Sequence, residues 1–134
     1  LGAWDKVLAL LGEGGTGRPA AFHALRGLAL FAAERFELAA VALETALSVD
    51  ATSAPAAFYL GWARASARQD ADALTAWRNA VRLDPALVSA YLAMADTYVR
   101  LSHPELAVQV LEAGLKAVPG SVELQARLDV VRRR

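Results

Sequence analysis

This 134-residue chain has no cysteine, no long apolar stretch and no net charge, and each of these absences excludes or disfavours a class of function. Without cysteine there is no disulfide, thiolate nucleophile or thiolate metal site, although the compartment stays open because many envelope proteins also lack cysteine. No stretch of about 18 or more uninterrupted apolar residues is present, so we expect a soluble protein without direct membrane insertion. Fourteen basic residues balance fourteen acidic ones, which argues against nucleic-acid binding because phosphates require a concentrated basic surface.

No set of residues predicts a catalytic, metal or cofactor site. His23 falls within an expected helix and His103 in a turn, without the i, i+4 spacing or third ligand that a zinc site needs. Residues 12–17 contain four glycines and resemble part of a phosphate-binding loop, but Arg18 and Pro19 stand where Lys followed by Ser or Thr is required. We therefore expect no enzyme activity, no cofactor and no metal, and we interpret the glycines as a link between helices.

The most informative feature is a repeat with a period of about 34 residues, a length typical of stacked helical hairpins. Small and apolar residues recur at the same offsets in three units that begin near Ala20, Ala54 and Val88. The recurring sets are Gly27, Gly61 and Ala95; Ala39, Ala73 and Ala107; Leu43, Trp77 and Leu111; and Ala46, Ala80 and Gly114. The small residues are expected where two helices approach closely, and the large ones between successive hairpins.

Each unit is predicted to contain two antiparallel helices joined by a short turn. In the first unit we expect helices over residues 20–33 and 36–48. In the second, Ser53 caps a helix that runs to about Arg68, and the next helix runs from Asp70 to the Asp84-Pro85 pair. The third unit follows the same plan, with helices over residues 86–100 and from the break at residues 102–104 to about 117, and Ser121 is a further N-cap.

These recurring residues together resemble the tetratricopeptide repeat over residues 20–119. The resemblance implies an all-α fold, a right-handed superhelical solenoid of antiparallel helical hairpins. The first unit departs most from the family pattern, with Arg26 at a usual Leu position and Ala51 at a usual Pro position. The implied single domain consists of a partial repeat helix and glycine-rich link (1–17), three repeats (20–53, 54–87 and 88–120) and a terminal capping helix (121–134).

The resemblance also implies a binding surface. In similar proteins the first helices of successive repeats line a concave groove that holds a peptide or a helix. The residues mapped to it here are Leu25, Leu28, Phe31, Phe58, Tyr59, Trp62, Leu92, Asp96 and Arg100. Chaperone-binding members hold a C-terminal carboxylate with Lys and Asn, whereas only Arg100 is basic among the mapped positions, so we expect an apolar ligand. Two alternatives stay open: the aromatic residues belong to the core, and Asp96 pairs with Arg100 one helical turn away.

Three functions from different classes follow. The first is a protein interaction scaffold or adaptor that binds an apolar peptide or amphipathic helix of a partner protein. The second is a self-association module of a homo-oligomer, and the third is a regulatory or substrate-binding domain of a larger enzyme. The first residue, Leu1, indicates a piece of a longer protein, and twelve Arg among fourteen basic residues favour a bacterial source, either cytoplasmic or associated with the cell envelope.

Overall fold

A computed structural model describes residues 2–12 and 17–133 of the chain, and within these residues it contains helices but no strand. The helices are α1 (Ala3–Leu11), α2 (Ala20–Ala32), α3 (Phe36–Val49), α4 (Ala54–Ser66), α5 (Asp70–Leu83), α6 (Val88–Arg100), α7 (Pro104–Ala117) and α8 (Val122–Arg132). The all-α class is confirmed, and the predicted helix ends agree to within about two residues, the usual spread in assigning them. Most of the glycine-rich link, residues 13–16, lies outside the described residues.

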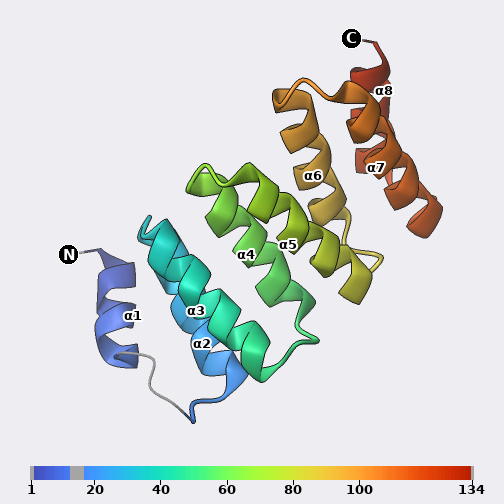
Figure 1. Ribbon diagram of the computed structural model, residues 1–134. Helices are drawn as coiled ribbons and strands as arrows, with labels where there is room; N and C mark the ends of the chain where they lie inside the picture. The colour runs from blue at the N-terminus through green and yellow to red at the C-terminus, as the bar shows by residue number, and fades with distance from the viewer. Residues whose placement is uncertain (1, 13–16, 134) are drawn as a thin grey trace. The chain divides into compact units, whose positions relative to one another are not determined.

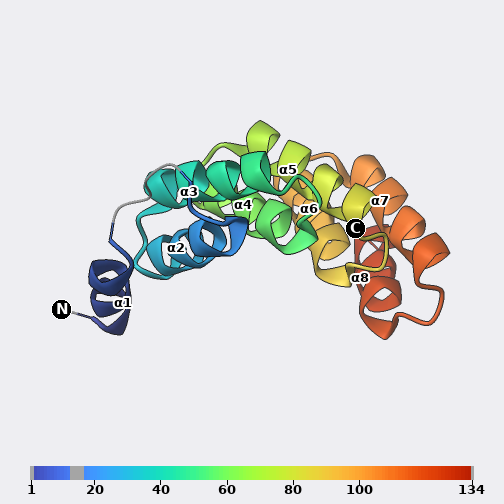
Figure 2. The same ribbon diagram turned by 90° about the horizontal axis from the view of Figure 1, so that it is seen from below.

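The chain divides into two compact units, Leu1–Ala76 and Trp77–Arg134. In the first unit, α2 and α3 form an antiparallel hairpin, α4 packs against α3, and α1 packs against α2 (Figure 1). In the second unit, α6 and α7 form a hairpin and α8 packs against both (Figure 2). Each unit therefore buries the apolar faces of its helices against neighbouring helices, as expected for hairpin repeats.

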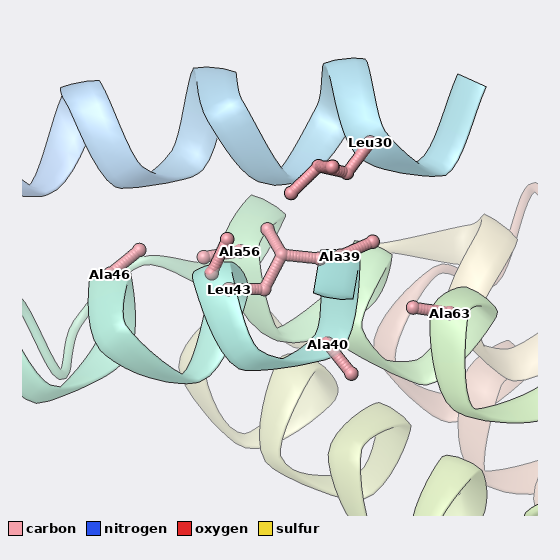
Figure 3. Close-up of a cluster of buried hydrophobic side chains, with 8 residues drawn as sticks. Leu30, Ala39, Ala40, Leu43, Ala46, Ala56 and Ala63 are labelled. Carbon is pink, nitrogen blue, oxygen red and sulfur yellow. The ribbon is translucent and has the colours of Figure 1, made fainter. Parts of the chain in front are cut away.

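The core of the first unit lies where α2, α3 and α4 meet. Leu30 of α2 points toward Leu43 of α3, with alanines of α3 and α4 around them (Figure 3). A Cβ atom added at Gly27 would lie 2.6 Å from the Leu43 Cγ and 3.4 Å from the backbone oxygen of Ala39. Glycine is therefore needed where α2 crosses α3 because any side chain would collide with a buried leucine.

In the second unit, Gly114 of α7 likewise permits a close contact with the neighbouring helices. A Cβ added there would lie 2.9 Å from the Tyr91 Cγ and 3.0 Å from the Leu124 Cδ1. The Tyr91 hydroxyl donates a hydrogen bond of 2.9 Å to the backbone oxygen of Pro85. Burial, helped by the Asp84 carboxylate, raises the pKa of Tyr91, so the neutral phenol that donates this bond is the favoured form.

Helix α8 begins as the sequence predicted, because the Ser121 hydroxyl accepts a hydrogen bond of 3.2 Å from the amide of Leu124. Leu124, Leu128 and Val131 are buried, whereas Val122 is 80% exposed. One side of α8 is thus packed on α6 and α7 and the other faces water. The role of α8 as the terminal cap of the array stays a prediction.

The turns inside the hairpins repeat in backbone geometry as well as in position. Glu34, Arg68 and Ser102 adopt positive φ angles of 62°, 63° and 66°. The amide of the residue after each one donates to a backbone oxygen near the end of the preceding helix, for example His103 to Tyr98 at 2.8 Å. This is the left-handed helix termination for which glycine is preferred, yet none of the three residues is glycine.

Glycine at position 102 should therefore stabilise the protein. We expect Ser102→Gly to raise the free energy of unfolding by about 1 kcal/mol, because glycine enters the left-handed region without steric cost. The matched control is Ser89→Gly on the exposed face of α6, which should lower it by about 0.5 kcal/mol since glycine is a poor helix former. Chemical denaturation measures both, and a loss of stability in Ser102→Gly would contradict the argument.

Candidate functional site

The six candidate residues in the first unit lie on α2 and α4, which contact each other. Leu25, Leu28 and Phe31 belong to α2, and Phe58, Tyr59 and Trp62 to α4. Their solvent exposure differs, with Leu25 47% and Trp62 40% exposed and the other four half-buried. We call these six residues the α2–α4 set.

The aromatic residues of α4 form a contiguous group. The Phe58 ring lies 5.3 Å from Tyr59 and 6.4 Å from Trp62, measured between ring centroids, and both contacts are edge-to-face. Such contacts stabilise a pair by about 0.5–1.5 kcal/mol beyond the burial of area. Trp62 is thus held by Phe58 on one side while much of its indole stays accessible to a ligand.

Two members of the α2–α4 set belong partly to the core. Phe31 and Tyr59 pack against the buried cluster around Leu30 and Leu43, and the Phe31 ring also lies 5.4 Å from that of Phe36. The alternative that some of the aromatic residues are core residues therefore holds for Phe31 and Tyr59 on their inner sides. Their role in partner binding stays a prediction, and the more accessible Leu25 and Trp62 are the better candidates for contact.

Charge is scarce around the α2–α4 set. The only charged residues in α2 and α4 are Arg26 and Arg64. The Arg26 Nε donates a hydrogen bond of 3.2 Å to the backbone oxygen of Gly12, and Arg64 forms an ion pair with Glu44 of α3 and donates to the Gln69 side chain at 2.8 Å. Both guanidinium groups already have protein partners, so what these helices offer a ligand is mainly apolar surface.

The remaining candidates, Leu92, Asp96 and Arg100, lie on α6 in the second unit. Leu92 is half-buried, whereas Asp96 and Arg100 are exposed. The Asp96 carboxylate forms an ion pair with Arg127 of α8, a partner that helical spacing did not predict. Asp96 is therefore already engaged within the unit, and an Asp96 role as a polar anchor for a ligand stays a prediction, as do the roles of Leu92 and Arg100.

The described residues show no arrangement suited to metal binding. Within residues 2–12 and 17–133, no group of three His, Asp or Glu side chains is placed to hold a metal ion. His23 is buried beside Phe22, and His103 is exposed with its Nδ1 3.5 Å from the Glu105 carboxylate, as expected for a structural and a solvated histidine. Nor does this part of the chain contain a helix that is long and apolar enough to cross a membrane.

Several large apolar side chains are exposed that the sequence analysis did not single out as surface residues. Leu38 and Val41 on α3 are 53% and 59% exposed, and Trp4 and Leu10 on α1 are 45% and 88% exposed. Leu38 and Val41 lie three residues apart on one helix, and this spacing alone does not show whether another helix covers them. In the structure α1 packs mainly against α2.

Comparison with known proteins bears on the fold. No protein-family model and no curated protein sequence matches the chain. Among solved structures, MamA has 22% identity and a TM-score of 0.72 over 75% of this chain, which spans only 59% of the MamA chain. The second TPR domain of human RPAP3, in complex with the HSP70 peptide SGPTIEEVD, has 18% identity and a TM-score of 0.71 over 86% of this chain and 99% of its own.

A third similar structure, the Arabidopsis OM64 TPR domain, has 16% identity and a TM-score of 0.73 over 86% of this chain and 95% of its own. The TM-scores establish the fold, whereas sequence identities this low leave the ligand open. The helical pairs, the small residues at their crossings and the similarity to these three structures all indicate the same fold. The chain therefore has the fold of a tetratricopeptide-repeat domain.

Proposed function

We propose that this chain is a protein interaction domain that binds an apolar peptide or an amphipathic helix of a partner protein through the α2–α4 set. The observation that carries the proposal is the accessible Trp62, held edge-to-face by Phe58 on a pair of helices with only two charged residues, of which Arg64 pairs with Glu44 and Arg26 donates to the Gly12 backbone oxygen. Tryptophan is among the residues that most often dominate binding energy at protein interfaces. An amphipathic helix would bury its apolar side on such a surface.

An acidic ligand is a weaker fit for this site. The peptide bound by the RPAP3 domain ends in EEVD and so carries several negative charges. Recognition of such a peptide draws on unpaired cations, whereas Arg26 and Arg64 are each engaged by a backbone oxygen or a carboxylate within the chain. Hydrophobic contact, with little dependence on salt, is therefore the proposed mode of binding.

The test is a pull-down from native lysate followed by titration of the recovered partner. We expect Trp62→Ala to weaken binding by about 2 kcal/mol, or roughly 30-fold, with the helical content measured by circular dichroism unchanged. Trp4→Ala is the matched control, because Trp4 is exposed to a similar degree but lies on α1. Raising the salt concentration should change the affinity only slightly, since no exposed charge pair carries the binding.

Two results would refute this mode of binding. One is an equal loss of affinity in Trp4→Ala and Trp62→Ala, which would show that recognition does not depend on the α2–α4 set. The other is a steep fall in affinity with salt, or loss of binding when the C-terminus of a peptide ligand is amidated. Either of these would indicate recognition of charge.

A further inference from the structure

Three polar contacts join α3 to α4, α5 to α6 and α7 to α8, and in each contact the two residues are 20 apart in the chain. The pairs are Glu44 with Arg64, Arg78 with Tyr98, and Glu112 with Arg132. The Arg78 Nη2 donates to the Tyr98 hydroxyl at 2.6 Å. The Arg132 Nη2 lies 3.3 Å from the Glu112 Oε1. Residues 44, 78 and 112 follow one another at 34-residue spacing, as do 64, 98 and 132, so the contacts share the period of the sequence repeat.

Apolar packing alone specifies poorly how far each helix is shifted along its neighbour. Six of the eight buried residues in the cluster formed by α2, α3 and α4 are alanines, and α4 contributes only Ala56 and Ala63. Burial of apolar area is non-directional, and short side chains form shallow ridges. A hydrogen bond or an ion pair requires particular atoms to come within bonding distance. A polar pair therefore distinguishes alignments that two alanine-rich faces tolerate.

A shift of one helical turn would break the ion pair between α7 and α8. The residues one turn before and after Glu112 are Val108 and Lys116. Neither is a carboxylate, and Lys116 would repel the Arg132 guanidinium. The residues one turn from Glu44, at positions 40 and 48, are likewise uncharged. Each glutamate is thus the only carboxylate on its helix that can meet the facing arginine at the native position or one turn away.

We propose that these three pairs fix the alignment of α4 on α3, of α6 on α5 and of α8 on α7, and that each pair acts as an exchangeable unit. All six side chains are at least partly exposed, so each pair adds little to the overall stability. Its effect is on register, because the native alignment is the one in which the pair is made.

The pairs are of two types, which makes the proposal testable. In the first and third pairs a glutamate faces an arginine, whereas in the middle pair Arg78 faces Tyr98. If the three positions are equivalent, either type should work at each of them when both members are transferred. Transfer of an arginine alone sets two arginines against each other.

The first test moves the glutamate–arginine pair to α5 and α6. Tyr98→Arg alone should lower the thermal midpoint by roughly 2–4 °C. With Arg78→Glu added, the midpoint should exceed the sum of the two single effects by about 2 °C or more, because the pair is recreated. Arg82→Glu is the matched control, since Arg82 is exposed on the same helix one turn further on. Its gain in the Tyr98→Arg background should be less than half as large.

The second test moves the arginine–tyrosine pair to α7 and α8. Helix α8 buries only three residues, so its amides report on a weakened alignment through hydrogen exchange. In Glu112→Arg the α8 amides should exchange about threefold faster than in wild type, with α6 unchanged. Adding Arg132→Tyr should return the α8 amides close to the wild-type rate.

Circular dichroism of each variant checks that it is folded, and the substituted side chains are not buried, so folding should persist. Equal gains from Arg78→Glu and Arg82→Glu overturn the proposal, because the contact position would then have no special role. So do α8 amides that exchange equally fast in Glu112→Arg and wild type. A double variant at 112 and 132 that exchanges as fast as Glu112→Arg overturns it as well.

Discussion

Replacing Leu43 with alanine should lower the free energy of unfolding by about 3–4 kcal/mol, within the range found for leucines buried in cores. Leu43 is fully buried at the centre of the first unit, where its neighbours include Ala39, Ala46 and Ala56 (Figure 3). Alanine side chains are short and cannot move into the space that Leu43 leaves. The cavity therefore stays open, and its cost adds to the lost burial of the leucine methyl groups.

Urea denaturation followed by circular dichroism measures this change, and Leu38→Ala on the same helix is the matched control. Leu38 is 53% exposed, so its truncation should change stability by no more than about 0.5 kcal/mol. Equal losses in Leu43→Ala and Leu38→Ala would mean that the cluster around Leu43 is not the core of the unit.

A valine at position 27 should destabilise the first unit by about 3 kcal/mol, at the upper end of the usual cost of overpacking. Its Cβ would lie 2.6 Å from the Leu43 Cγ, and the two methyl groups would need further space. Replacing a helical glycine gains less than about 1 kcal/mol of helix propensity, which is too little to offset the collision.

A double-mutant cycle identifies the atoms responsible for this effect. In the Leu43→Ala background the space beside Gly27 is open, so Gly27→Val should cost at least about 1 kcal/mol less than in wild type. Thermal or urea unfolding of the four proteins gives the coupling energy. Additive losses would show that the two residues do not compete for the same space, contrary to the geometry.

Much of the helical framework could be predicted from local signals. Ser53 and Ser121 were expected as N-caps, and their hydroxyls accept hydrogen bonds from the amides of Ala56 and Leu124. The small residue at Gly27 was expected where two helices cross, and the structure places it against Leu43. These features depend on hydrogen bonds within one turn and on a repeated spacing, so the order of residues along the chain determines them.

The candidate binding residues were predicted less completely. The helical spacing of Phe58 and Trp62 indicated that they share a face of one helix, and their rings do contact each other. Spacing did not reveal that Phe31 and Tyr59 pack partly on the core, because that depends on how closely α2 and α4 approach α3. Whether an apolar residue is buried in the core or exposed at the surface depends on the neighbouring helices. A repeat pattern specifies only which side of a helix is apolar.

The sequence by itself therefore determined the helices, their pairing into hairpins and the small residues at their crossings. Tertiary structure alone decided which partner each exposed group meets. Asp96 binds Arg127, 31 residues away on α8, and Asp5 of α1 binds Arg35, 30 residues away in the turn before α3. The tertiary structure also decided that Leu38 and Val41 of α3 are not covered by α1 and stay exposed to solvent. The physical reason is that helix formation follows from contacts within a few residues, whereas coverage of a helix face depends on where a distant segment comes to rest.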